Sequence, residues 1–264
     1  MNQSESKCSS APQADRYDRQ LPLFGEEGQQ RLADASVFIA GAGGLGSPVA
    51  TYLAAAGVGR IVLLDSDIVD LTNLNRQFLH HEKDIGRKKA ESGAEKLKAL
   101  NPEIQIDSIC GRLTEENIEK WIGDCQMIVD ALDNNPTRRM LASFAIQMGL
   151  PYFHAAVSGF QGQLASFYPE SGPCYFCAFP EDEETDATDA KKPTFPIVGA
   201  TAGIIGAMQA NEVIKYITAV GKKDAGKLFI WDGTANRFEA IEIEKEDSCH
   251  RCGKNENKSE NENR

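Results

Sequence analysis

The sequence lacks both a long apolar run and a secretion-type N-terminus. No segment reaches the roughly 18 uncharged apolar residues that cross a bilayer. The nearest approach, residues 197–211, is short and rich in glycine, and we expect it to form a core helix. The first fifteen residues show no basic-then-apolar signal pattern. These absences argue against a membrane protein and favour a cytoplasmic one.

Basic residues are also scarce. The 264 residues include 28 lysines and arginines against 39 acidic residues, which gives a formal net charge of −11. A field of this sign repels nucleic-acid phosphates and anionic lipid headgroups. The composition therefore argues against nucleic-acid binding as the main task and favours a basic partner or a local basic pocket. The chain is long enough to bury one substantial core.

What the sequence does contain is a glycine cluster between two apolar runs, VFIAGAGGLGSPVATYLAAAGVGRIVLLD. Gly41, Gly43 and Gly46 fit the pattern GxGxxG, and Asp65 ends the second run. In such a turn a phosphate can approach the backbone and the N-terminus of the next helix, while the aspartate accepts hydrogen bonds from ribose hydroxyls. The pattern predicts a nucleotide site, with a purely structural turn as the alternative. It does not distinguish NAD from ATP.

Short β-rich runs alternate with helical patterns from residue 36 to residue 157. This alternation predicts an α/β fold of the Rossmann-like, doubly wound type with a mostly parallel sheet, because parallel neighbours need crossover helices. Residues 162–169, 227–233 and 237–244 alternate like antiparallel strands, and a hairpin turn joins the last two. We expect these strands to extend the same sheet in the C-terminal third.

The two ends of the chain differ in composition from the middle. Residues 1–15 and 254–264 are polar and are predicted to be disordered tails. Between them, residues 16–253 are expected to form a single domain, with a nucleotide-binding part at about 16–157 and a second part at about 158–253. The acidic loop at 181–196 is of a length that is usually either functional or disordered.

Seven cysteines in a protein expected in a reducing compartment indicate metal binding or chemistry rather than disulfides. Four of them form two CxxC pairs about seventy residues apart. Two such pairs complete the tetrahedral sulfur site that structural Zn²⁺ prefers. We therefore predict a structural zinc ion; a redox pair is the alternative, although it would need no second copy. The predicted ligands are Cys174, Cys177, Cys249 and Cys252.

The dehydrogenase interpretation of the glycine turn has little chemical support elsewhere in the chain. No tyrosine has a lysine four positions later, which removes one common proton-donating pair. Of the four histidines, His154 alone stands where it could serve hydride transfer, at a strand end, and such a histidine is more often structural.

Charged residues after Asp65 favour a different chemistry. Asn73, Arg76 and Gln77 lie on a short helix-like turn, and Lys88 and Lys89 begin the next helical pattern. Asp133 follows the strand MIVDAL, so it is expected at the same sheet edge as the glycine turn, where doubly wound folds bind ligands. Each residue alone could be an ordinary surface charge.

Together these motifs resemble a known family. YDRQL, GAGGLGSP, a D-x-D after the second strand, NLNRQ, GRKKAE, DALDN, CYFC and CHRC are similar, in order and spacing, to the ThiF/MoeB/HesA family. The resemblance spans residues 17–253. It implies an ATP-dependent adenylyltransferase that joins AMP to the C-terminal glycine of a ubiquitin-like sulfur-carrier protein ending in Gly-Gly, releasing pyrophosphate. The second part of the domain, at 158–253, would then bind the carrier and the zinc ion.

The resemblance also implies roles for individual residues. ATP would be bound by the glycine turn, by Asp65 at the ribose and by three side chains at the triphosphate: Gly41, Gly43, Gly44, Gly46, Asp65, Asn73, Arg76 and Lys89. Arg76 and Lys89 would stabilise charge in the reaction, and Asp133 would bind Mg²⁺. Lys88 is the weaker choice, because the family's catalytic lysine directly precedes the position of Ala90. Arg19 matches an arginine that reaches into the partner subunit's ATP site, which implies a catalytic homodimer.

The sequence departs from some relatives in having no cysteine in the 181–196 loop. Cys110 and Cys125 adjoin apolar strands and are expected to be buried, and Cys8 lies in a tail. We therefore predict an enzyme that stops at the acyl adenylate. Its pathway, of molybdopterin or thiamine type, is left open. Three alternatives stay open: activation of a tRNA base or a peptide, an NAD-dependent oxidoreductase, and an inactive zinc-stabilised scaffold.

Overall fold

The structure is a computed structural model and describes residues 15–169, 172–180, 196–221, 223 and 225–253. The predicted tails lie outside the described residues apart from Asp15, and so does the acidic loop apart from Pro196. The described strands form one eight-stranded sheet in the order β3-β2-β1-β4-β5-β6-β7-β8. Within the described part of the chain, no helix is long and apolar enough to cross a membrane.

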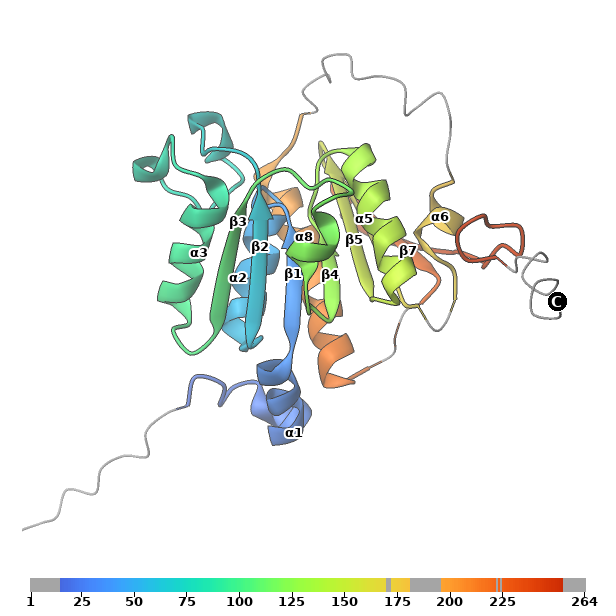
Figure 1. Cartoon of the computed structure of the whole chain (residues 1–264), viewed down its shortest axis with the longest axis horizontal. Coiled ribbons are helices and arrows are strands. Elements are labelled where there is room, and N and C mark those ends of the chain that lie inside the picture. Colours follow the sequence, from blue (N-terminus) through green and yellow to red (C-terminus); the bar gives the residue numbers. More distant parts are fainter. Residues whose placement is uncertain (1–14, 170–171, 181–195, 222, 224, 254–264) are drawn as a thin grey trace, which may run out of the picture.

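The first five strands are parallel and alternate with helices (Figure 1). The elements are α1 (Leu21–Asp34), β1 (Ser36–Ala40), α2 (Gly46–Ala56), β2 (Arg60–Asp65), α3 (Lys89–Leu100), β3 (Gln105–Cys110), α4 (Ile118–Ile122), β4 (Met127–Asp130), α5 (Asn135–Met148) and β5 (Tyr152–Ser158). Two short 3-10 helices, η1 (Leu71–Asn73) and η2 (Glu82–Asp84), lie between β2 and α3. The predicted doubly wound parallel sheet is confirmed.

The strands are apolar on both faces because helices cover both. Val37 and Ile39 of β1 point into a core shared with α1, α2, α3 and α8 (Gly199–Thr218), whereas Phe38 and Ala40 point into a core shared with α4 and α5. This alternation is what a buried parallel strand requires, since successive side chains point to opposite faces. The carboxyl ends of β1, β2 and β4 therefore meet at one edge of the sheet.

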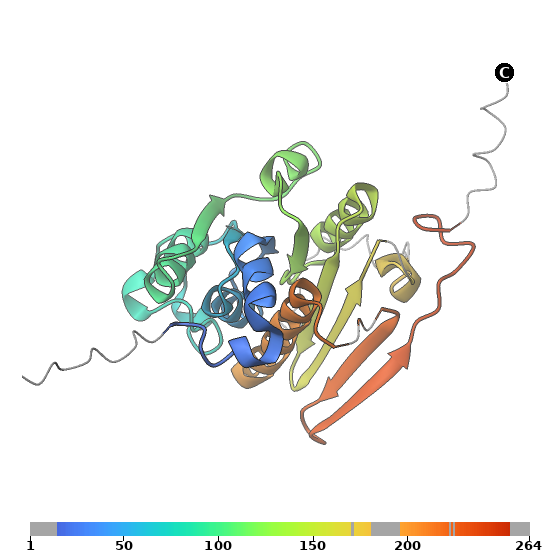
Figure 2. The same ribbon diagram turned by 90° about the horizontal axis from the view of Figure 1, so that it is seen from below.

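The C-terminal third extends the sheet with antiparallel strands, as predicted. These are β6 (Gln161–Phe167), β7 (Lys227–Asp232) and β8 (Arg237–Glu242). Figure 2 shows the β7–β8 hairpin at one end of the sheet, apart from the long helices. From Gly199 onward, the 197–211 segment forms the first part of helix α8, which packs on α2 and β5. The short α6 (Tyr175–Ala178) follows β6.

Two expectations need correction. Cys110 is exposed, whereas Cys125 is buried as predicted. The reason is that β3 is the edge strand of the sheet, so its burial falls off toward its C-terminal end, where Cys110 stands. Of the helical patterns expected between residues 36 and 157, the one at 114–122 forms a helix only over Ile118–Ile122. Asn117 hydrogen-bonds back to Arg112 and Thr114 and holds the preceding residues in a turn.

Candidate functional site

The glycine turn joins β1 to α2 at the carboxyl edge of the parallel strands. Gly41 has φ of +106°, and a Cβ there would lie 2.5 Å from the carbonyl oxygen of Ala131. A Cβ at Gly46 would lie 1.9 Å from the carbonyl oxygen of Gly41. These two glycines are therefore required by the backbone itself. By contrast, a Cβ at Gly43 would meet nothing closer than Gln77 Nε2, at 3.6 Å, so that side of the turn is open to a ligand.

Asp65, at the end of β2, is tied to the glycine turn. One carboxylate oxygen accepts a hydrogen bond from the Ala42 N–H at 2.8 Å, and the other accepts from the Asp67 N–H at 2.8 Å. Burial raises the pKa of Asp65, and the two N–H donors and Lys89 oppose this effect. The carboxylate is thus held in place where a ribose bound at the turn would meet it.

Lys89 and Lys88 are placed very differently, although they are adjacent. Lys88 is exposed, whereas the side chain of Lys89 is 8% exposed and its Nζ lies 3.1 Å from Asp67 Oδ2. Lys89 is the first residue of α3, and its N–H donates to the Asp67 carbonyl at 3.0 Å. The buried amine therefore stays next to the Asp65 end of β2.

Arg76 lies against the glycine turn. A Cβ at Gly44 would be 3.6 Å from Arg76 Cγ and 3.4 Å from Ala202 Cβ of α8. The guanidinium donates to the Thr72 carbonyl at 2.9 Å and to Asn75 Oδ1 at 3.0 Å, which leaves further donors available. Asn73 caps the short helix η1 by accepting a hydrogen bond from the Asp70 N–H at 3.1 Å.

Two buried polar atoms beside this turn have no hydrogen-bond partner among the described residues. They are Ser47 Oγ, in the first turn of α2, and Gln77 Oε1, on the side chain that faces Gly43. Buried polar atoms are normally paired, so two orphans at one place indicate a polar ligand. The open turn, the two cations and these orphan atoms together fit a nucleotide with its phosphates.

Asp133 stands on the loop after β4, and its side chain is exposed. The loop begins at Ala131, whose carbonyl abuts Gly41, so Asp133 belongs to the same edge as the glycine turn. Within the described part of the chain no hydrogen bond or ion pair occupies its carboxylate. An exposed, unengaged carboxylate beside a phosphate site is the kind of oxygen ligand that Mg²⁺ takes together with phosphate oxygens.

Arg19 is not brought to this edge. Tyr17, two residues earlier, lies against Gly57 at the end of α2, and its hydroxyl accepts from Asn101 Nδ2 at 2.9 Å. Gly57 is the C-cap of α2 and Asn101 is the C-cap of α3, so both contacts lie at the opposite end of α2 from the glycine turn. Within one chain, the length of α2 separates Arg19 from the nucleotide edge.

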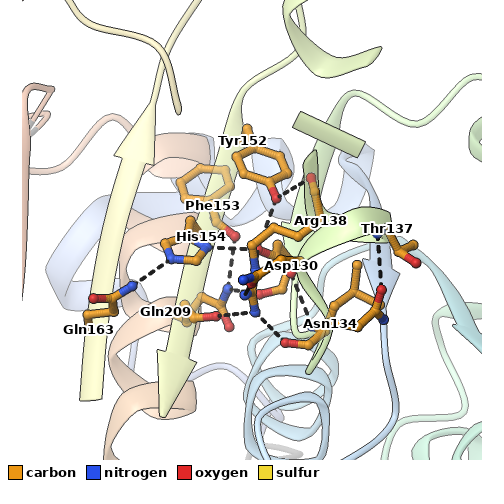
Figure 3. A network of polar contacts seen from close by, with 12 residues as sticks. Asp130, Asn134, Thr137, Arg138, Tyr152, Phe153, His154, Gln163 and Gln209 are labelled. Atoms are coloured by element: carbon orange, nitrogen blue, oxygen red, sulfur yellow. Dashed lines mark hydrogen bonds and ion pairs between the residues drawn. The ribbon is translucent and has the colours of Figure 1, made fainter. Parts of the chain in front are cut away.

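Sequence reasoning missed a buried network beneath the edge, shown in Figure 3. Asp130 is fully buried at the end of β4 and accepts hydrogen bonds from Arg138 Nε at 2.8 Å, Tyr152 Oη at 2.9 Å and His154 Nδ1 at 2.8 Å. Burial alone would raise the pKa of Asp130, but Arg138 and His154 outweigh it and lower that pKa to about 2. An aspartate closing an apolar strand, eight residues before an arginine, was the available signal.

His80 is a second residue that sequence reasoning did not assign. It is buried, and its Nε2 lies 2.9 Å from the Ala42 carbonyl in the glycine turn, while its Nδ1 lies 3.0 Å from Ser92 Oγ on α3. Burial lowers the pKa of His80, which favours the neutral ring. His80 therefore braces the glycine turn against the helix that carries Lys89.

The four predicted zinc ligands meet in one cluster. Their ligand atoms all lie within 4.8 Å of one another, and the Sγ–Sγ distances are 3.8 Å for Cys174–Cys177, 3.7 Å for Cys174–Cys249 and 3.5 Å for Cys177–Cys252. A tetrahedral site with Zn–S bonds of about 2.3 Å needs sulfurs about 3.8 Å apart. The cluster therefore has the ligand set and spacing to hold zinc.

The fold and this site define an α/β protein with an open glycine turn at the switch point of its sheet and a four-cysteine cluster beside the antiparallel extension. A model of the ThiF family matches residues 17–252. The protein belongs to the ThiF family.

Similar curated proteins cover nearly the whole chain. The SAMP-activating enzyme E1 of Haloferax volcanii is 38% identical over 92% of this chain and 90% of its own. The sulfur carrier protein adenylyltransferase of Thermus thermophilus is 38% identical over 90% of both. The sulfur carrier protein ThiS adenylyltransferase of Escherichia coli is 37% identical over 90% of this chain and 94% of its own.

Solved structures agree on the fold. E. coli MccB, solved with ATP, superposes with a TM-score of 0.80 at 23% identity, covering 92% of this chain and 75% of that one. PaaA superposes with a TM-score of 0.76, also at 23% identity, covering 93% and 78%. At this identity the likeness establishes the architecture, including the antiparallel extension.

Proposed function

We propose that this protein is an ATP-dependent adenylyltransferase that activates the C-terminal glycine carboxylate of a ubiquitin-like sulfur-carrier protein. The product would be an acyl adenylate, and pyrophosphate would be released. One observation carries the proposal: Arg76 lies against the open glycine turn, and Lys89 and Asp133 follow the neighbouring strand ends, in a chain whose ThiF relatives are named as carrier adenylyltransferases.

The chemistry suits these residues. A C-terminal carboxylate has an ordinary pKa of about 3.5, so at neutral pH it is already ionised and needs no general base. What the reaction needs is cations that bring two anions together and stabilise charge on the α-phosphate and the leaving pyrophosphate. At an effective dielectric of about 20, two unit charges about 4 Å apart interact by about 4 kcal/mol. We propose that Arg76 and Lys89 supply this stabilisation.

The family resemblance also implies the other roles, and the positions of the side chains support them. Asp65 would bind the ribose, and the turn formed by Gly41, Gly43, Gly44 and Gly46 would face the phosphates. Asn73, with its oxygen engaged by the Asp70 N–H, would offer its amide N–H groups to the triphosphate. Asp133 would contribute to Mg²⁺ binding, and Cys174, Cys177, Cys249 and Cys252 would hold a structural Zn²⁺.

Arg19 requires a second copy of the chain. Its position at the far end of the sheet supports a role at the ATP site of a partner subunit, and hence a homodimer. Mixing an Arg19→Ala chain with a Lys89→Met chain tests this, because each mixed dimer would hold one intact site. Recovered activity in the mixture supports the homodimer, and additive loss without recovery contradicts it.

We further propose that residues 16–253 act as one adenylation domain, with the carrier bound by the part from about residue 158 onward. The chain would stop at the adenylate, in a sulfur pathway of molybdopterin or thiamine type. Its compartment would be the cytoplasm, where thiols that bind metal stay reduced. Two of the three relatives above are named as sulfur carrier protein adenylyltransferases, and none of the three is named as an oxidoreductase.

Pyrophosphate exchange into ATP tests the function directly. Purified carriers ending in Gly-Gly are assayed one at a time, and stimulation by one of them identifies the pathway. With that carrier, Asp133→Ala and Arg76→Ala are each expected to abolish exchange while leaving the thermal unfolding midpoint unchanged. Full exchange in either variant would contradict its assigned role, and no stimulation by any carrier would contradict the proposed substrate.

A further inference from the structure

The loop from β4 to α5 is held by its backbone on both sides of Asp133. Before Asp133, the Leu132 N–H donates to Asp130 Oδ1 at 3.1 Å. After it, Asn134 Oδ1 accepts from the Thr137 N–H at 3.0 Å and caps α5. The Asp133 side chain itself stays exposed between these two fixed points. The loop therefore presents one free carboxylate on a constrained backbone.

Arg138 makes most of the remaining contacts to this loop. Its Nη2 donates to the Leu132 carbonyl, and its Nη1 donates to Asn135 Oδ1 at 3.0 Å. Its Nε donates to Asp130 Oδ2 at 2.8 Å, so the same guanidinium joins the end of β4 to the start of α5 (Figure 3). A planar guanidinium with donors in a fixed fork can impose this geometry, which a single-point cation cannot.

The anchor for Arg138 is buried and rigid. Asp130 is 0% exposed, and its Oδ2 also accepts from Tyr152 and His154, both on β5. Gln209 of α8 donates to the carbonyls of Asp130 and Phe153 at 2.9 Å each, which locks β4 against β5. A buried ion pair of this kind often adds no more stability than apolar residues would, so stability alone does not account for it.

We propose that Arg138 is a positioning residue for the metal-binding carboxylate: it sets the conformation of residues 131–135 and thereby where Asp133 meets a divalent cation. The inference rests on the proposed function for the role of Asp133. Supporting groups that orient a metal ligand typically change metal affinity about 10- to 100-fold when they are removed. Arg138 would act through the backbone, without touching the nucleotide.

The test uses Arg138→Lys in the full-length chain, because lysine keeps the charge opposite Asp130 but loses the fork. Mn²⁺ binding to the protein–ATP complex is measured by electron paramagnetic resonance, and exchange of the 131–135 amide hydrogens is measured by mass spectrometry. We expect Mn²⁺ binding about tenfold weaker, with metal-free ATP binding within about twofold of wild type. Amide exchange should be about tenfold faster at 131–135 and unchanged at 41–46.

Controls separate positioning from folding. Arg139→Lys changes the next residue of the same helix, which contacts the Pro180 carbonyl, and should leave every readout unchanged.

If Arg138→Lys does not fold, the Asn135→Ala variant tests the proposal instead. It removes an exposed hydrogen-bond acceptor of Arg138 without leaving a buried charge unpaired, and we expect about threefold weaker Mn²⁺ binding. Unchanged Mn²⁺ affinity and amide exchange would overturn the proposal. A wild-type chain that binds no Mn²⁺ with ATP would instead overturn the role of Asp133, and amide exchange would still decide on Arg138.

Discussion

The nucleotide edge and the cysteine cluster gather their polar groups in different ways. At the edge, Asp65, Arg76, Lys89 and Asp133 come from four separate segments and are spread around an open turn. In the cluster, four thiols from two CxxC pairs converge within 4.8 Å, three of them buried. At the edge, buried side chains such as His80 and Asp130 hydrogen-bond to the loops and hold them in place. The cysteine cluster consists only of the four thiols that would bind an ion.

The difference shows what fixes the geometry of each site. The edge is organised by hydrogen bonds that the protein makes with itself, so we expect its shape to be the same with and without ATP. Burial raises the pKa of the Cys174 thiol, and a metal ion must displace its proton to bind there. We therefore expect changes at the edge to alter chemistry with the fold intact, and changes in the cluster to alter the fold with nucleotide binding largely intact.

The largest expected effect is on catalysis at the edge. Lys89→Met removes a buried cation while keeping the length of the side chain, and carrier-dependent pyrophosphate exchange should fall by about 100- to 1000-fold. The free energy of unfolding should change by about 1 kcal/mol or less, since the partner Asp67 is exposed. Lys88→Met, at the exposed neighbour, is the control and should stay within about twofold. Equal losses in both variants would show that the rate depends on the total positive charge of this segment and not on the buried position of Lys89.

The opposite pattern is expected in the cluster. Cys249→Ser should release about one zinc per chain and lower the free energy of unfolding by about 4 kcal/mol, because metal binding is coupled to folding. ATP affinity, measured by calorimetry, should stay within about threefold. Cys110→Ser at the exposed edge-strand cysteine should change neither metal content nor stability. An unchanged zinc content in Cys249→Ser would contradict the proposal that this cluster binds zinc.

A pH experiment probes the buried support of the edge. The pKa of Asp130 is about 2 in the folded chain, below its ordinary value of 3.8. Because the folded value is depressed, the stabilisation is fully present above about pH 4 and is lost as the pH falls toward 2. It amounts to about 2 kcal/mol. Urea unfolding should show that the free energy of unfolding falls more steeply with decreasing pH in wild type than in an Asp130→Asn, Arg138→Met double variant. All other acid-sensitive groups are the same in the two chains. Parallel curves would mean that the carboxylate is not stabilised as described.

The sequence was sufficient for the parts of the molecule that local patterns encode. Strand–helix alternation predicted the parallel sheet, and period-two runs predicted β6, β7 and β8 on the same sheet. Two CxxC pairs predicted the cysteine cluster, because their residue type and spacing leave few other uses. The choice of Lys89 rather than Lys88 as the catalytic lysine came from the family resemblance, because nothing in a single sequence distinguishes two adjacent lysines.

What sequence reasoning could not supply are contacts between distant segments. Asp130, Tyr152 and His154 are ordinary strand residues until the sheet places β4 beside β5. His80 reaches the Ala42 carbonyl across 38 residues. Cys110 was expected to be buried because its strand is apolar, but the order of strands left β3 at the sheet edge. Each of these depends on tertiary geometry that no local pattern records.

The smallest expected effect is on ATP affinity, and it distinguishes a glycine that leaves room for a ligand from a glycine that the backbone requires. Gly43→Ala adds a methyl group with 3.6 Å of clearance to Gln77, so the free energy of unfolding should change by about 1 kcal/mol or less. The methyl would nevertheless occupy the side of the turn where phosphate must approach, and ATP binding should weaken about tenfold. Gly41→Ala should instead destabilise the fold, because φ is +106° and the Ala131 carbonyl would be only 2.5 Å away. If Gly43→Ala bound ATP as tightly as wild type, the open side of the turn would not be the phosphate seat, although the turn itself would remain intact.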